Sequence, residues 1–233
     1  MSQPNATPTP RVIAKTIDHA LLKPTMTLDE IEAGYDLAIR LDVASVCVMP
    51  FGLARCAERL ADCTVEPSTV IGFPHGVNTT AAKAAEAEQA LADGGTELDM
   101  VVNTPWVLSA KWGDVAADIK AVLEPTHAGG QKIKVIFETC QLGTSHIARL
   151  SELCTELGAD WIKTSTGFGS VGATPEAVRT MRAHAGDQVQ IKASGGVRTL
   201  DDVILYRELG CTRCGSSSTE AIMAEATAKL AAE

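Results

Sequence analysis

Two lysines lie inside short apolar runs that are typical of buried strands. Lys163 lies in the run at residues 161–164 and Lys192 in the run at residues 189–193, and small residues, hydroxyls and glycines follow each run. A lysine in such a place must be solvated, paired or uncharged, because an unpaired buried charge is costly. An uncharged lysine amine is a nucleophile that forms Schiff bases with carbonyl compounds. These positions therefore suggest the addition of an amine to a carbonyl.

The two lysines are expected on neighbouring strands, whose backbones run about 5 Å apart. At that distance, with an effective dielectric constant of about 20, two ammonium groups repel by about 3 kcal/mol. This repulsion lowers one lysine pKa by about two from its usual value of about 10.4, which raises the uncharged share of that amine near neutral pH. Asp99 is placed to relay the protons of a carbinolamine, through water. The competing interpretation is a structural ion-pair network in which the lysines only balance Asp18, Asp99 and Glu138.

Short apolar strands alternate with helical segments along the chain. The strands are expected at residues 16–18, 45–48, 69–72, 97–102, 133–138, 161–164, 189–193 and 213–215. The helices are expected near residues 28–41, 52–61, 80–92, 112–123, 144–157, 200–209 and 219–231, with another that begins at about Pro175. Eight such units predict an α/β fold with a single (β/α)8 (TIM) barrel over residues 11–233, after a tail at residues 1–10 that we expect to be disordered. A doubly wound open sheet, the alternative, would normally have about five or six units and a glycine-rich turn after its first strand.

The alternation of side chains along each strand divides them between the lumen of the barrel and the helices outside. If Asp99 points inward, Leu98 and Met100 point outward. The residues that this rule places in the lumen, near the carboxyl ends of the strands, are Asp18, Cys47, Asp99, Glu138, Lys163 and Lys192. Barrel enzymes keep their chemistry at that end. Because no histidine is placed to activate Cys47, we expect its thiol to line the pocket and not to act as a nucleophile.

Glycine-rich turns follow the last three predicted strands, at residues 166–167, 194–196 and 215–218. Glycines allow a ligand to approach the backbone closely, and amide groups near helix starts bind anions. Turn formation alone would explain any one of these runs. Three of them on adjacent loops favour a phosphate site, which recurs in the last loops of barrels.

The charge, cysteine and histidine content argues against several classes of protein. A net charge of −9 argues against nucleic acid or an anionic membrane as the partner. No apolar stretch approaches a membrane span, and the start of the chain lacks the pattern of a signal peptide. Seven scattered cysteines without CxxC pairs indicate reduced thiols and a cytoplasmic protein. The five histidines form no metal-binding pair, so we expect no metal and no cofactor.

Several runs together resemble the deoxyribose-phosphate aldolases, which are class I aldolases of the barrel fold. Residues 161–168 (WIKTSTGF) resemble the Schiff-base strand of that family, and residues 191–199 (IKASGGVRT) resemble its second lysine motif. Further matching runs lie at residues 17–24, 70–74, 83–87, 97–101 and 135–139. The resemblance extends over residues 13–218, and the two lysine motifs together are highly specific.

The resemblance implies reversible cleavage of 2-deoxy-D-ribose 5-phosphate to D-glyceraldehyde 3-phosphate and acetaldehyde, in deoxyribonucleotide and deoxynucleoside catabolism. By position, Lys163 would form the Schiff base, Lys192 would lower its pKa and Asp99 would join the proton relay. The implied substrate-binding residues are Asp18, Cys47, Thr166, Gly167, Gly195, Gly196, Ser216 and Ser217. The implied partners are the sugar phosphate and acetaldehyde, and a homodimer is the expected assembly.

The chain departs from the family pattern at positions that bear on acceptor range and phosphate affinity. Ala20 stands where threonine is common, Met49 where asparagine is usual, and Phe168 where some members have lysine. Cys214 replaces a larger aliphatic residue, residues 104–106 differ from a glycine-containing turn, and the tail lacks the tyrosine that ends some members. Two other functions stay open. One is a cofactor-free Schiff-base aldolase for a different sugar phosphate, and the other is a phosphate-binding regulatory barrel, which would not need paired lysines.

Overall fold

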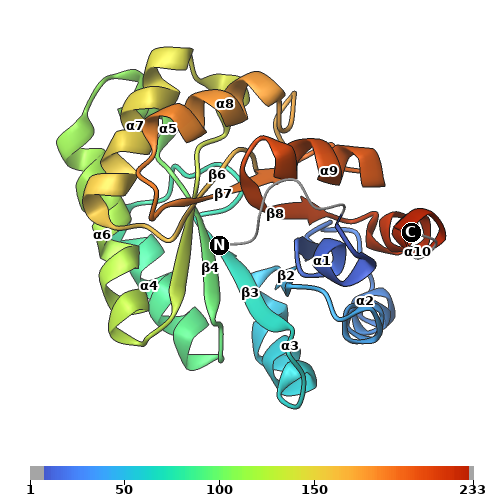
Figure 1. The fold of residues 1–233 in the computed structure, drawn as a ribbon. Helices are drawn as coiled ribbons and strands as arrows, with labels where there is room; N and C mark the ends of the chain where they lie inside the picture. The colour runs from blue at the N-terminus through green and yellow to red at the C-terminus, as the bar shows by residue number, and fades with distance from the viewer. Residues whose placement is uncertain (1–7, 231–233) are drawn as a thin grey trace.

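Eight parallel strands form a closed barrel, in which each strand pairs with the next along the chain and the last pairs with the first (Figure 1). The structure is a computed structural model that describes residues 8–230. The strands are β1 (Ile17–Leu21), β2 (Ser45–Val48), β3 (Glu66–Ile71), β4 (Glu97–Val101), β5 (Lys132–Ile136), β6 (Trp161–Lys163), β7 (Gln190–Ser194) and β8 (Cys211–Ser216). The predicted (β/α)8 barrel is confirmed.

Helices surround the barrel and connect its strands (Figure 1). They are α1 (Pro10–Ala14), α2 (Leu28–Leu41), α3 (Leu53–Leu60), α4 (Thr80–Ala92), α5 (Thr104–Leu108), α6 (Trp112–Ala128), α7 (Thr144–Leu157), α8 (Pro175–His184), α9 (Leu200–Glu208) and α10 (Thr219–Leu230), with short 3₁₀ helices η1 (Pro50–Gly52) and η2 (Thr139–Gln141). Capping boxes start two of them, Thr27 with Glu30 at α2 and Thr199 with Asp202 at α9. None of the helices within residues 8–230 is long and apolar enough to cross a membrane.

Two short helices were not expected from the sequence. The first, α1, begins at Pro10 with Thr9 as its cap, so the described structure starts inside the predicted tail of residues 1–10, whose first seven residues lie outside the described residues. The second, α5, follows β4. Asn103 caps it by accepting a hydrogen bond from Trp106 N (3.3 Å), and Pro105 suits its first turn. Neither helix is long enough to show an apolar period.

Four strand boundaries also differ from the predictions by two residues or more, among them the end of β1, which continues to Leu21 and does not stop at residue 18. β3 begins at Glu66 and β8 at Cys211, both earlier than expected, because pairing with neighbouring strands continues beyond the apolar run. β5 ends at Ile136, earlier than expected. The physical reason is that Glu138 takes a left-handed backbone conformation (φ 54°), which a strand does not tolerate.

The predicted division between lumen and helix-facing side chains is confirmed by the packing. The outward strand residues that join one large core with the helices include Ile17, Val46, Val48, Leu98, Met100, Val135, Phe137, Ile162, Val189 and Ile191. Cys47 was expected to point inward, and it is absent from this helix-facing core. It packs in a separate small cluster with Leu22 and Val70. Within the strands, period-two alternation therefore decided correctly which side chains face the lumen; Glu138, beyond the end of β5, is the exception.

A buried ion pair outside the barrel connects α4 to α6. Lys83 Nζ lies 2.5 Å from Asp118 Oδ2, and both side chains are buried. Lys83 also donates to Val101 O (2.9 Å) at the end of β4, while Glu86 accepts from Gly72 N (2.6 Å) just after β3. Helix α4 therefore holds the carboxyl ends of two neighbouring strands.

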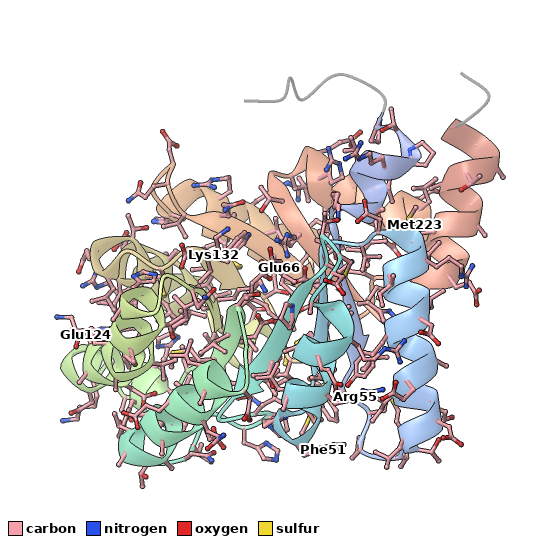
Figure 2. The ribbon with its side chains drawn as sticks, turned by 90° about the horizontal axis from the view of Figure 1, so that it is seen from below. Phe51, Arg55, Glu66, Glu124, Lys132 and Met223 are labelled. Atoms are coloured by element: carbon pink, nitrogen blue, oxygen red, sulfur yellow. The ribbon has the colours of Figure 1, made fainter. Side chains whose placement is uncertain are left out.

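The two ends of the barrel carry different parts of the chain. In Figure 2, Glu66 and Lys132 mark the amino ends of β3 and β5, and Phe51, just after β2, lies at the opposite end. The loops that lead from each strand to its helix gather at the end of the barrel where Phe51 lies. This is the end at which barrel sites are built.

Candidate active site

Three lysine side chains meet the carboxylate of Asp99 inside the barrel. Lys163 Nζ lies 2.7 Å and Lys192 Nζ 2.8 Å from the same oxygen, Oδ2. Lys134 Nζ lies 3.0 Å from the other oxygen, Oδ1. Lys163 and Lys192 are direct partners in the register of β6 and β7, as the sequence predicted. Their two amines therefore share one carboxylate oxygen.

Two more carboxylates and an arginine extend this network through the lumen. Lys192 Nζ lies 2.5 Å from Asp18 Oδ2, and Arg213 lies 2.6 Å from Asp18 Oδ1. Glu97 lies 2.5 Å from Lys134 and 2.9 Å from Arg213. Each charge thus has an oppositely charged partner within hydrogen-bond distance, as burial requires.

Among the four cations of this network, Lys163 is the one with a lowered pKa. Burial is the chief cause of the lowered pKa; the charge of Asp99 opposes it, and the charge of Lys192 lowers it further. From the sequence, the charge of Lys192 was the expected chief cause of the lowered pKa of Lys163, whereas in the structure desolvation comes ahead of it. A lowered pKa raises the uncharged share of the amine, which is its nucleophilic form.

Lys192 keeps its charge. Burial alone would lower its pKa, but the charges of Asp18 and Asp99 raise it. Burial would likewise raise the pKa of Asp99, but the three lysines around it outweigh burial and lower that pKa. The site therefore combines an ionised carboxylate, a charged amine and an amine that gives up its proton readily.

A cavity of about 340 Å³ opens next to this network at the carboxyl ends of the strands. The predicted site residues that line it are Asp18, Cys47, Lys163, Thr166, Gly167, Lys192, Gly195, Gly196, Ser216 and Ser217. Asp99 does not line the cavity and instead accepts hydrogen bonds from both amines, Lys163 and Lys192. The structure thus brings every predicted site residue to the cavity or into contact with its lysines.

The loops after β6, β7 and β8 form one wall of the cavity. The backbones of the first two loops are in direct contact at Gly172 and Gly195. They are so close that a Cβ built on Gly172 would lie only 2.0 Å from Gly195 O. Gly167 and Gly196 have left-handed φ angles of 88° and 84°. These turns therefore present backbone to the cavity and leave room for a ligand beside it.

The Ser216 hydroxyl is engaged by the β7–α9 loop and by its own loop. It donates to Val197 O (2.7 Å) and accepts from Ser218 N (3.0 Å). Because its hydrogen is already donated, this loop would meet an anion chiefly through backbone amides. Lys23 and Arg198 also line the cavity and bring positive charge to it; the sequence analysis did not single out either residue as a ligand.

Glu138 was expected in the lumen beside the other carboxylates, but its carboxylate supports a loop instead. It accepts from the backbone N–H of Thr166 (3.4 Å) and from the Thr166 hydroxyl. The Thr166 hydroxyl oxygen in turn accepts from Phe168 N (3.0 Å). The left-handed turn at Glu138 directs its side chain to the β6–α8 loop, which explains the difference.

The side of the cavity near β1 and β2 carries apolar residues beside the charged Asp18 and Lys23. The apolar residues are Ala20, Leu22 and Cys47. The rings of Phe73 and Phe168 meet edge to face, with centroids 5.3 Å apart. Burial raises the pKa of the Cys47 thiol, which agrees with a wall residue and not with a thiolate nucleophile. Two departures from the family pattern, Ala20 and Phe168, thus lie around the cavity and outside the charged network.

Three members of the charged network, Glu97, Lys134 and Arg213, were not predicted from the sequence. A signal existed for two of them. The alternation that puts Asp99 inward also puts Glu97 inward, and charged and apolar residues alternate over residues 132–135, which puts Lys134 inward. Arg213 has no comparable signal. The register of β8 against β7 shifts between Ile191 and Lys192, so the direction of Arg213 emerges only from the strand pairing.

Comparison with known proteins gives concordant matches. The model of the DeoC/LacD family aldolases matches residues 12–211. The chain is 55% identical over 218 residues to the deoxyribose-phosphate aldolase of Rhodopirellula baltica, covering 94% of this chain and 90% of that protein. It is 47% identical over 210 residues to deoxyribose-phosphate aldolase 2 of Staphylococcus aureus strain MRSA252 (90% and 94%). The tetrameric deoxyribose phosphate aldolase of Aeropyrum pernix superposes with a TM-score of 0.86 at 28% identity (93% and 91%).

Proposed function

Because this chain belongs to the DeoC/LacD family of aldolases, we propose that it is a class I aldolase that reversibly cleaves 2-deoxy-D-ribose 5-phosphate to D-glyceraldehyde 3-phosphate and acetaldehyde. One observation carries the proposal. Lys163 is a buried lysine with a lowered pKa that lines the cavity, and it shares an oxygen of Asp99 with a second, charged lysine. This arrangement supplies a neutral nucleophile together with groups that accept and return protons.

The reaction begins with attack of Lys163 Nζ on C1 of the open-chain sugar. The amine gives up a proton, the carbonyl oxygen gains one, and the carbinolamine loses water to form an iminium. Asp99, hydrogen-bonded to Lys163, relays these protons, through water where the reacting oxygen lies out of its reach. Lys192 stays charged beside the same carboxylate and thereby keeps it ionised.

The iminium then withdraws electrons as the bond between C2 and C3 breaks. The C3 hydroxyl gives its proton, through water, to the ionised carboxylate of Asp99 and becomes the aldehyde of glyceraldehyde 3-phosphate, while the electron pair of the broken bond forms an enamine on Lys163. Asp99 then returns that proton, again through water, to C2 of the enamine. Hydrolysis of the resulting iminium releases acetaldehyde and frees Lys163, and the reverse sequence is the aldol addition.

The phosphate group occupies the wall formed by the last three βα loops. The backbone amides of Gly195, Gly196 and Ser217 are its ligands, because all three residues line the cavity and no atom lies within 4 Å of a Cβ built at Gly196. Arg198 and Lys23 add positive charge on the same cavity. A few local cations and amide dipoles are enough to attract an anion to a chain with a net charge of −9.

The test is an assay of deoxyribose 5-phosphate cleavage with EDTA present, followed by the reverse reaction with alternative donors. We expect cleavage that EDTA does not inhibit, and aldol addition with acetaldehyde as donor. Absence of cleavage at every pH would refute the aldolase proposal. Addition with dihydroxyacetone phosphate in place of acetaldehyde would instead identify an aldolase for a different sugar phosphate.

Two further features belong to this proposal. We place the reaction in the cytoplasm, because all seven cysteines are free, as expected of reduced thiols. The homodimer expected from the sequence also remains a proposal, and one relative, the aldolase of Aeropyrum pernix, is tetrameric. Light scattering of the purified protein would separate monomer, dimer and tetramer.

A further inference from the structure

The charged side chains in the lumen nearly balance one another in number. Among residues 8–230, the lumen network contains three carboxylates, Asp18, Glu97 and Asp99, and four cations, Lys134, Lys163, Lys192 and Arg213. If Lys163 is uncharged, three negative and three positive charges remain. The set is then neutral, which is the favourable state for groups removed from water.

Lys134 holds a central place in this set without reaching the cavity. Its side chain has no exposed surface, and Nζ lies 2.5 Å from Glu97, 3.0 Å from Asp99 Oδ1 and 3.3 Å from Asp18 Oδ2. It is not among the residues that line the substrate cavity. Any effect of Lys134 on the reaction must therefore pass through these carboxylates and not through substrate.

We propose that Lys134 is a positioning residue for the aldol reaction: it holds Asp99 Oδ1 so that Oδ2 faces both Lys163 and Lys192, and its charge completes the balance that lets Lys163 exist without a proton. The inference rests on the function proposed above. It assigns Lys134 no contact with substrate.

The charge count gives the direction of the effect. Without Lys134, three carboxylates would face only two permanent cations, and a proton on Lys163 would restore neutrality. The pKa of Lys163 should therefore rise. The opposite holds for Glu97: without its charge, a proton on Lys163 adds to an excess of positive charge, and the pKa of Lys163 should fall further.

The groups that face Lys134 come from several strands of the barrel. Asp18 on β1, Glu97 and Asp99 on β4 attract it, and Arg213 on β8 opposes it. The ring of Trp161 on β6 lies 5.7 Å from its Nζ, a cation–π distance.

The remaining titratable groups face Lys163. They are Asp99 on β4, Lys192 on β7 and the Cys47 thiol on β2, whose pKa burial raises. On β3, Ser68 and Val70 are buried and not ionisable, and Glu66, which follows the same alternation, is exposed at the amino end of the strand. The count of charges near the nucleophile is thus complete for the described strands.

The experiment measures the pH dependence of kcat/KM, together with the pH dependence of borohydride trapping by acetaldehyde, in three variants. Lys134→Met should move the acid limb of both profiles up by about one pH unit or more, and it should lower kcat. Glu97→Gln should move the limb down. The double variant K134M/E97Q should return the limb towards its wild-type position while kcat stays low, because Asp99 Oδ1 still lacks its anchor.

Lys83→Met is the matched control, since Lys83 is an equally buried lysine that pairs with a carboxylate outside the lumen. It should lower the unfolding temperature but leave the acid limb unchanged. An unmoved limb in K134M, with wild-type turnover normal, would overturn the inference and leave a purely structural ion pair. If K134M is too unstable to assay, an unmoved limb in E97Q would overturn it equally. Absence of wild-type turnover would instead refute the proposed function.

Discussion

Lys163 and Lys192 have the same side chain and almost the same distance to Asp99 Oδ2, yet their pKa values shift in opposite directions. The difference is a second carboxylate. Lys192 also lies 2.5 Å from Asp18, whereas Asp99 is the one carboxylate within ion-pair distance of Lys163 among the described residues. With a single negative partner, burial outweighs attraction at Lys163 and its pKa falls; with two, attraction wins at Lys192. In the mechanism that we propose, Asp18 therefore decides which of the two amines is the nucleophile.

This asymmetry makes a prediction about covalent trapping. Borohydride reduction with acetaldehyde should leave an ethyl group on Lys163, located by peptide mass spectrometry. Lys163→Leu should give no adduct in the site. Lys192→Leu should still give one, but only at higher pH, because loss of the neighbouring positive charge raises the pKa of Lys163. An adduct chiefly on Lys192, or an unchanged pH dependence in Lys192→Leu, would contradict these roles.

At the scale of elements, the site depends on loops that pack through their backbones. The β6–α8 and β7–α9 loops meet at Gly172 and Gly195. The β6–α8 loop is also held by Glu138, whose carboxylate accepts a hydrogen bond from the backbone N–H of Thr166. Any side chain at Gly172 would push the two loops apart. The wall that we propose for the phosphate is therefore a composite of neighbouring loops, and its shape follows from the strand order of the barrel.

A charge placed on that wall should affect phosphate and little else. Gly196 has room for a side chain, since no atom lies within 4 Å of a Cβ built there, and aspartate and asparagine tolerate its left-handed backbone better than most residues. Gly196→Asp should raise KM for deoxyribose 5-phosphate by roughly tenfold or more and change KM for free deoxyribose much less.

Gly196→Asn is the control for Gly196→Asp, because it has nearly the same shape and no charge. It should have a much smaller effect on the phosphorylated substrate. Equal losses on both substrates in the aspartate variant would mean that the loop is structural and that the phosphate lies elsewhere.

At the scale of the whole molecule, the first strand is tied to the last helix by a buried histidine. His19 Nδ1 lies 2.7 Å from the hydroxyl of Thr219 at the start of α10, and its side chain is only 4% exposed. Burial lowers the pKa of His19 to about 4. The native protein therefore resists protonation of this ring, whereas the unfolded chain takes up a proton at about pH 6.5.

The consequence is a loss of stability in mild acid. A depressed native pKa contributes stability that is complete above the unfolded value of about 6.5 and is lost as the pH falls towards about 4, by roughly 3 kcal/mol. His19→Gln should be less stable than wild type at neutral pH but should lose less stability between pH 7 and pH 4. Urea unfolding across that range measures it, with His75→Gln, at an exposed position, as the control. A loss in His19→Gln as large as in wild type would assign the acid sensitivity to other groups.

The sequence by itself determined the barrel, the order of its strands and most of the site. Period-two alternation and turn residues are local properties, and in a parallel barrel of consecutive units they also decide which strands are neighbours. For that reason Asp18, Asp99, Lys163 and Lys192 could be brought together before any coordinates were known. The loop glycines followed from the same order.

The tertiary structure decided what depends on register, burial and exact direction. The shift in β8 aims Arg213 into the lumen, the left-handed turn at Glu138 sends its carboxylate to Thr166, and neither is visible as a pattern. Desolvation, the chief cause of the lowered pKa of Lys163, exists only once the strands and helices have closed around it. Pair interactions can be anticipated from spacing along a strand, but burial is a sum over the whole fold.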